Sequence, residues 1–163
     1  MAGEKNKWTT LEKKYGFEDK ELTTPKHDDL VIKLLDKNYF IKYIIREYSE
    51  GLFDLETLDI KSEIPIHSYN SFIIGYWDIV ASCISSNHKT KYYLMVEVKP
   101  SIRSFGETLR QINTYKSFFR KVKTEVNLVF IFSPDLRFKE QFEGQDIYVR
   151  SPNNALDMVI NNA

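Results

Sequence analysis

The chain has 163 residues, of which 42% are hydrophobic and 28% charged, and its formal net charge at pH 7 is zero. This length and composition indicate one globular domain with a substantial core and exclude a largely disordered chain. A net charge of zero gives no general electrostatic attraction to nucleic acid, although a local basic surface remains compatible with it. The N-terminus lacks the apolar core of a signal peptide, and no apolar run approaches the roughly 18 residues that cross a bilayer. We therefore expect a cytoplasmic protein without a membrane partner.

Cysteine and histidine give no sign of a metal cluster. Cys83 is the only cysteine, which excludes an internal disulfide and a zinc site built from thiolates. It lies in an apolar run, so we expect a small buried side chain rather than a reactive thiol. The histidines, His27, His67 and His88, do not have the spacing of metal ligands.

The first part of the chain is predicted to be helical after a polar, lysine-rich arm over residues 1–24, and residues 25–163 are predicted to form one domain. Thr24 and Pro25 suit the cap and first turn of a helix. Apolar residues with helical spacing follow, with an interruption around residues 36–38. Gly51 is the predicted C-terminal stop.

Three strand-like runs come next, over residues 60–67, 72–84 and 91–99. All three are rich in residues that favour strands. Pro65 favours a sheet edge or a bulge in the first run, because proline cannot donate a ladder hydrogen bond. The polar residues between the second and third runs predict a hairpin turn.

The remaining elements are a helix and one buried strand. Ser104–Glu107 has the form of a capping box that opens a helix, which is predicted to reach about residue 122. Residues 127–132 are almost wholly apolar, as in a strand covered on both faces. Residues 146–149 are a candidate extra strand and 153–160 a candidate closing helix. The order of elements predicts an α/β domain whose central, mixed, four-stranded sheet is flanked by helices.

Three charged residues stand at the ends of the predicted core strands. Asp78 lies on the second strand, and Glu97 and Lys99 lie on the third, with Pro100 directly after them. Side chains two residues apart on a strand project to the same face, so Glu97 and Lys99 project together. Charged groups are seldom buried without a partner or a metal ion, so this group predicts a site.

These residue types suit metal-assisted cleavage of a phosphodiester. Mg²⁺ is typically held by one or two carboxylates together with water and phosphate. Asp78, Glu97 and the carbonyl of Val98 are the predicted ligands of Mg²⁺ or Mn²⁺. Lys99 is the predicted group that activates water or stabilises charge on the phosphate.

An acid-x-Lys triplet carries no information by itself, because this chain has others, at Glu12-x-Lys14, Glu18-x-Lys20 and Asp59-x-Lys61. The triplet at Glu97 differs, because it lies in a strongly apolar strand, after an acid on the neighbouring strand and before a helix that carries glutamine. In that context the chain resembles the PD-(D/E)XK nuclease superfamily over roughly residues 27–132. The resemblance implies a restriction-endonuclease-like fold with a helix–three-strand–helix–strand core, and metal-dependent hydrolysis of DNA.

The resemblance also implies roles for individual residues. Asp78 matches the acid of the second core strand, and Glu97 and Lys99 match the acid-x-Lys pair of the third. Gln111 and Tyr115 match the Gln-x-x-x-Tyr element of branches similar to RecB-type nucleases, in which these residues assist the site or contact DNA. One departure is that Trp77, rather than proline, precedes Asp78.

Many branches of the superfamily also use an acid from the first helix. Asp29 is the preferred candidate here and Glu47 the second, because no spacing rule decides between them. Glu63, on the first strand, ranks lower. Asp28 and Asp29 also suit a helix start without any function, because negative charge near the N-terminus complements the helix dipole.

Basic residues are concentrated near the second helix. Arg103, Arg110 and Lys116, with Tyr115, are the candidate contacts to nucleic acid. Such a run also suits an ordinary solvated helix face, and both interpretations remain open at this stage.

Two other functions are compatible with the same residues. The first is a nucleic-acid-binding or assembly domain of the same fold with weak or no cleavage. The second is an unrelated α/β domain in which the acids only form ion pairs with nearby lysines. The sequence leaves open whether the substrate is a duplex end, a single strand, a flap or a junction, and whether it is DNA or RNA. A homodimer or a partner protein is a candidate source of specificity.

Overall fold

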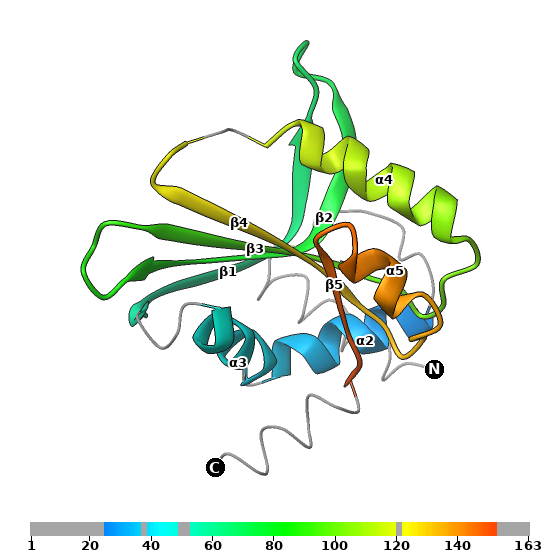
Figure 1. The fold of residues 1–163 in the computed structure, drawn as a ribbon, viewed down its shortest axis with the longest axis horizontal. Helices are drawn as coiled ribbons and strands as arrows, with labels where there is room; N and C mark the ends of the chain where they lie inside the picture. Colours follow the sequence, from blue (N-terminus) through cyan, green and yellow to red (C-terminus); the bar gives the residue numbers. More distant parts are fainter. Residues whose placement is uncertain (1–24, 37–38, 49–52, 120–121, 153–163) are drawn as a thin grey trace, which may run out of the picture.

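The computed structural model describes residues 25–36, 39–48, 53–119 and 122–152 (Figure 1). The predicted arm over residues 1–24, the predicted stop at Gly51 and the predicted closing helix over 153–160 lie outside the described residues. Among the helices that the structure describes, none is long and apolar enough to span a membrane.

The centre of the fold is a five-stranded mixed sheet rather than the predicted four-stranded one. Its strands lie side by side in chain order: β1 (Phe53–His67), β2 (Ile73–Ser85), β3 (Lys91–Val98), β4 (Glu125–Phe132) and β5 (Ile147–Arg150). The first three form an antiparallel meander, and β4 and β5 are parallel to their neighbours. The candidate extra strand over residues 146–149 is the fifth strand, because it pairs with the end of β4.

Helices cover both faces of the sheet (Figure 1). The predicted interruption near residue 36 separates two helices, α2 (Pro25–Leu35) and α3 (Tyr39–Tyr48), which lie on one face. On the other face lie α4 (Phe105–Ser117) and the short α5 (Lys139–Glu143). The sequence did not predict α5, because five residues are too few to show a helical period.

The alternation of side chains on β3 divides the core into two layers, as the strand pattern predicts. Leu94, Val96 and Val98 belong to the cluster packed under α2 and α3. Met95 belongs to the cluster packed under α4 and α5. Cys83 is buried in the first cluster, which confirms its predicted role as a small core side chain.

The start of α4 follows the predicted capping box, but its end does not follow the prediction. The Ser104 hydroxyl accepts a hydrogen bond from the Glu107 backbone N–H at 3.3 Å. The helix ends at Ser117, before the predicted end near residue 122, and Val122 is exposed rather than part of the buried face. The predicted end was too late because apolar residues with helical spacing continue in the sequence after Ser117, where the helix ends.

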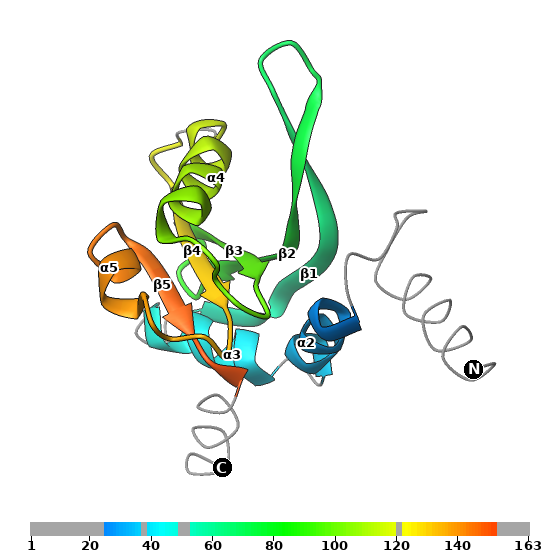
Figure 2. The same cartoon turned by 90° about the vertical axis from the view of Figure 1, so that its right-hand side faces the viewer.

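The β1–β2 hairpin extends well beyond the rest of the sheet (Figures 1 and 2). The first strand begins at Phe53, not at residue 60, and passes through an irregularity between Asp54 and Asp59. Pairing of β2 with β3 ends at Ile79, whereas pairing of β2 with β1 continues to Ile73. We call residues 64–77, the part of this hairpin beyond the end of β3, the arm. The term does not refer to the predicted N-terminal arm over residues 1–24.

A small polar clasp fixes the loop that leads into α4. The Asp135 carboxylate accepts hydrogen bonds from the Ile102 N–H at 2.9 Å and from the Arg137 guanidinium at 2.8 Å. Arg137 in turn donates to the Ile102 carbonyl oxygen at 2.9 Å. The clasp therefore joins the loop after β3 to the loop after β4, and both loops lie at the same end of the sheet as Glu97.

The clasp predicts acid-sensitive stability. Two hydrogen bonds hold the pKa of the Asp135 carboxyl well below its usual value. The one from the Arg137 side chain has the larger effect, and the one from the Ile102 N–H has the next largest. A carboxyl with a lowered pKa in the folded state stabilises that state above its unfolded pKa, and the effect disappears as the pH falls through the folded pKa. We expect Asp135→Asn to lower the Tm by a few degrees at pH 7 and by progressively less below about pH 4. Thermal unfolding from pH 2 to 7 measures this, and a difference that does not change with pH would contradict it.

Candidate active site

Asp78 lies where the arm separates from the sheet. If the β2–β3 register continued past the Ile79–Val96 pair, Trp77 would lie opposite Val98. Instead the Asp78 carboxylate accepts a hydrogen bond from the Val98 N–H at 2.7 Å. The side chain thus replaces a backbone partner that the departing strand no longer supplies, and it joins the ends of β2 and β3.

Glu97, Lys99 and Gln111 form one hydrogen-bonded group, as the sequence predicts. The Lys99 Nζ lies 3.2 Å from Glu97 Oε1 and donates to Gln111 Oε1 at 2.9 Å. The Gln111 Nε2 donates to the same Glu97 oxygen at 3.1 Å. Gln111, from α4, therefore holds both the lysine and the carboxylate of β3 in place.

Tyr115 extends this group toward the arm. Its hydroxyl accepts a hydrogen bond from Gln111 Nε2 at 3.2 Å, and its ring lies edge-on to Trp77 with 5.2 Å between centroids. A Cβ atom at Gly75 would lie only 2.6 Å from the Tyr115 Cζ atom. The absence of a side chain at Gly75 is therefore what lets the tyrosine approach the arm so closely.

The structure adds His27 and Asp28, which the sequence did not assign to the site. His27, on α2, lies with Nε2 3.2 Å from Asp78 Oδ1 and Nδ1 3.1 Å from Asp28 Oδ1. Asp28 is buried, although it stands in the first turn of a helix. In the sequence, His27 and Asp28 appear only as adjacent residues at the start of an amphipathic helix. That pattern does not show which strand residue the pair will contact.

The candidate acids from the first helical region and the first strand differ in how they lie relative to Asp78. Asp29, the preferred candidate, is exposed, and its neighbour Asp28 takes the place next to His27. Glu47 is exposed and lines a hollow beside Glu143 and Arg150, toward β5. Glu63 is half-buried on β1, between Ser62 and Ile64, which pair with Ile79 and Trp77 of β2. Glu63 therefore lies opposite Asp78 on the neighbouring strand.

Burial makes Glu97 an unusual carboxylate. Desolvation is the main cause that raises the pKa of Glu97 to about 8, and the negative charge of Asp78 is the second. Lys99 acts in the opposite direction and lowers the pKa. Its Oε2 atom is buried and has no hydrogen-bond partner in the part of the chain that the structure describes. A buried carboxylate oxygen without a partner is unfavourable, and a cation beside it would remove that cost.

His27 supplies positive charge on the opposite side of Asp78. Burial by itself lowers the pKa of His27, but the hydrogen bonds and charges of Asp78 and Asp28 outweigh that effect and raise the pKa to about 9. Desolvation is the main cause of the raised pKa of Asp28. A protonated His27 donates to both carboxylates, which fixes the orientation of Asp78.

The residues present fit a divalent ion that takes few protein ligands. In the described ranges, no three His, Cys, Asp or Glu side chains are grouped so as to hold a metal ion. A complete protein cage is therefore not present in these residues. Mg²⁺, however, is usually held by one or two carboxylates with water and phosphate. Asp78 and Glu97 with the unpartnered Oε2 atom meet that smaller requirement.

The candidate nucleic-acid contacts do not form one stripe. Arg103 and Arg110 are exposed, whereas Lys116 and Tyr115 are half-buried. Arg110 and Lys116 are six residues apart on α4, which places them about 120° apart around the helix axis. Only Tyr115 among these four contacts the Gln111 group directly.

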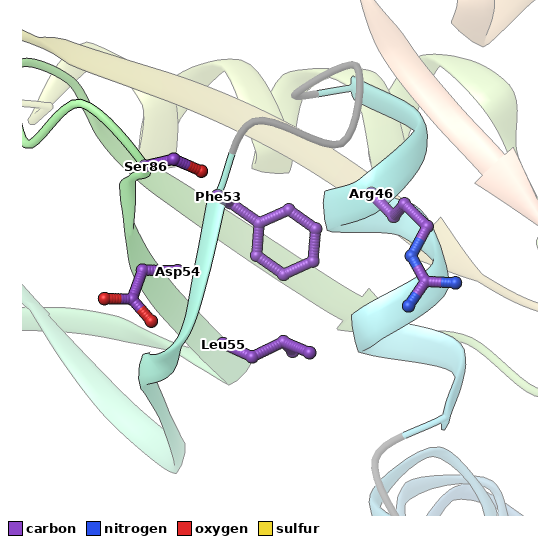
Figure 3. A pocket seen from close by; sticks show the side chains of 5 residues that line it. All are labelled: Arg46, Phe53, Asp54, Leu55 and Ser86. Carbon is purple, nitrogen blue, oxygen red and sulfur yellow. The ribbon is translucent and has the colours of Figure 1, made fainter.

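A hollow near the start of β1 lies away from this group (Figure 3). It has a volume of about 370 Å³ and is lined by Arg46, Phe53, Asp54, Leu55 and Ser86. Phe53 pairs with Ser85, so the hollow lies at the opposite end of β2 from Asp78. It contains none of the candidate residues.

No family model, curated protein or solved structure matches the chain. The assignment of a function therefore depends on the residues themselves and on the contacts that they make.

Proposed function

We propose that this protein is a metal-dependent nuclease that hydrolyses phosphodiester bonds in DNA. One observation carries the proposal: the buried carboxylate of Glu97 has an unpartnered oxygen and lies beside a second carboxylate and a lysine. An ion-pair network alone explains Glu97 Oε1, which faces Lys99 and Gln111, but it leaves Oε2 without a partner.

Each residue of the group has a distinct role in this proposal. Asp78, Glu97 and the carbonyl of Val98 hold Mg²⁺ or Mn²⁺, which supplies Lewis-acid stabilisation of phosphate charge when it is bound. Lys99, fixed by Gln111 and Glu97, orients the attacking water and stabilises negative charge that develops on the phosphate. His27 and Asp28 hold Asp78 in position.

The order and pairing of the elements support the same proposal. A helical region, an antiparallel meander of three strands, a helix and a fourth strand parallel to the third follow in turn. This is the order that the resemblance to the PD-(D/E)XK superfamily implies. The strand β5 and helix α5 add to that core on its outer side.

The first test is removal of the metal ion. We expect the wild-type protein to cut at least one of single-stranded, duplex, flap or branched DNA with Mg²⁺ or Mn²⁺, and to cut none in EDTA. The same ions should raise the Tm of the wild-type protein, because a ligand that binds only the folded state stabilises it. Labelled substrates resolved on gels and thermal unfolding measure the two effects, and parallel RNA substrates define the class of nucleic acid.

The proposal requires that the variant Glu97→Gln does not cut DNA. It should lose both the cleavage and the rise in Tm with Mn²⁺, because the amide cannot supply a charged ligand. Asp59→Asn is the matched control, since Asp59 begins an acid-x-Lys triplet of the same form but is exposed. Cleavage by Glu97→Gln at the wild-type rate, or no cleavage of any substrate by the wild-type protein, would overturn the proposal. In the second case, retained DNA binding would favour a non-catalytic domain of the same fold.

A further inference from the structure

The tip of the arm exposes apolar side chains that the core does not use. Tyr69 is 86% exposed, Phe72 71% and Ile73 52%. Large apolar groups gathered at one exposed place usually mark a contact surface, because solvating them is unfavourable. The hairpin rises away from the rest of the sheet (Figure 2), and Tyr69 and Phe72 belong to the turn that connects β1 to β2.

Hydrogen bonds hold the tip in a defined shape. Ser68 N–H donates to the Phe72 carbonyl at 2.7 Å, and Phe72 N–H donates to the Ser68 hydroxyl at 3.2 Å. Ser71 adopts a φ of 65°, a conformation that a side chain other than glycine rarely takes. The turn thus presents Phe72 on an ordered backbone rather than on a loose loop.

The end of α4 supports the arm from the side. The Tyr69 ring packs on the Phe118 ring with 5.0 Å between centroids, and its hydroxyl donates to the Ser117 carbonyl at 3.3 Å. Nearer the sheet, Trp77 packs on Tyr115 and Phe119. A continuous series of contacts therefore joins the tip, through Tyr115, to Gln111 and the candidate active site.

Neither the arm nor the segment that includes most of α4 carries negative charge, and the second of them is basic. Residues 64–77, which form the arm, contain no acidic residue, and neither do residues 108–124, which include most of α4. The second segment carries five basic residues, namely Arg110, Lys116, Arg120, Lys121 and Lys123. In a chain with equal numbers of acidic and basic residues, this is a local imbalance in favour of phosphate binding.

We propose that the tip of the arm inserts Phe72, supported by Tyr69, between bases of the DNA that the candidate active site cuts. This inference rests on the proposed function. Five residues lie between Phe72 and Asp78. The six steps along the strand span at most about 20 Å. That length corresponds to about six nucleotides along the helix axis. The arm would thus fix how far from the contacted bases the backbone is cut.

The test measures DNA binding separately from cleavage. A DNA probe carries 2-aminopurine, whose fluorescence increases when the base loses its stacking, and Ca²⁺ replaces Mg²⁺ so that the probe stays intact. We expect the wild-type protein to raise the fluorescence and to bind the probe. Phe72→Ser should abolish the fluorescence change and weaken binding about tenfold, the typical effect of losing one aromatic platform.

Leu55→Ser is the matched control. Leu55 is also an exposed apolar residue of the β1–β2 hairpin, but it lies at the opposite end of the hairpin from Phe72, where it lines the hollow of Figure 3. It should bind the probe like the wild-type protein. Thermal unfolding checks that both variants are folded. A second pair, Tyr69→Ser and Tyr69→Phe, separates loss of the ring from loss of the hydroxyl contact to Ser117.

The outcomes separate this inference from the proposed function. If Phe72→Ser weakens binding but the wild-type protein cuts nothing with Mg²⁺ or Mn²⁺, the arm is a DNA contact and the nuclease proposal falls. If the wild-type protein cuts and Phe72→Ser binds and unstacks bases equally well, the arm proposal alone falls. If sedimentation shows that the wild-type protein is a dimer and Phe72→Ser a monomer with unchanged DNA affinity, the tip binds a second copy and the proposal is overturned. Absence of any DNA binding by the wild-type protein overturns both.

Discussion

Lys99→Met should cut DNA about 10²- to 10⁴-fold more slowly than the wild-type protein, the range that a single positioned catalytic group usually contributes. The Lys99 Nζ atom forms an ion pair with Glu97 at 3.2 Å and donates a hydrogen bond to Gln111 at 2.9 Å, which fixes its position. Methionine keeps most of the length of the side chain but removes the charge and the hydrogen-bond donors. Single-turnover cleavage at saturating Mn²⁺ measures the effect on the chemical step.

The matched control for this variant is Lys61→Met. Lys61 also follows an acid by two residues and lies 3.5 Å from Asp59, but both side chains are mostly exposed. Exposed ion pairs contribute little, so this variant should cut and unfold like the wild-type protein. Lys99→Met should keep the rise in Tm with Mn²⁺, because the lysine is not a ligand. Equal cleavage rates for the two variants would contradict the role of Lys99.

The second large effect is expected at Asp78, where two substitutions separate structure from catalysis. Asp78→Ala removes the acceptor for the buried Val98 N–H and one partner of His27. Leaving a buried donor unpaired costs about 1–3 kcal/mol, so this variant should be less stable by that amount. Asp78→Asn keeps an oxygen that can accept from Val98 and should unfold much closer to the wild-type protein.

Both Asp78 variants should nevertheless lose cleavage and the rise in Tm with Mn²⁺, because neither supplies a second carboxylate. Denaturant unfolding gives the difference in stability, and gel assays give the cleavage rate. Full cleavage by Asp78→Asn would show that Asp78 acts only as a structural cap on β3. Equal stability of the two variants would instead show that Val98 N–H finds another partner.

Much of the site could be predicted because it depends on local patterns. The alternation of β3 predicted that Glu97 and Lys99 project together, and in the structure both of them contact Gln111 of α4. Pro100 predicted that the strand would end beside them, and β3 ends at Val98. The capping residue Ser104 predicted where α4 would begin. Each of these features depends on residues that are close in the sequence.

The sequence could not predict which acid of the first helix lies in the site, because that depends on how the helix is rotated about its own axis. Successive helix residues differ by about 100° around the axis, so Asp28 and Asp29 face different surroundings. Their identical chemistry leaves no local reason to prefer one of them. The packing of α2 against the end of β2 decides it, since that packing brings His27 to Asp78 and buries Asp28.

What the sequence by itself determined is the order of the main helices and strands and the faces that they bury, because the periods of two and 3.6 residues appear in the pattern of neighbouring side chains. The tertiary structure alone decided the fifth strand of the sheet, the contact of Asp78 with Val98 and the length of the arm. Each of these depends on pairing or packing between segments far apart in the chain. Such contacts are set by the register of one whole element against another, and no local pattern specifies that register.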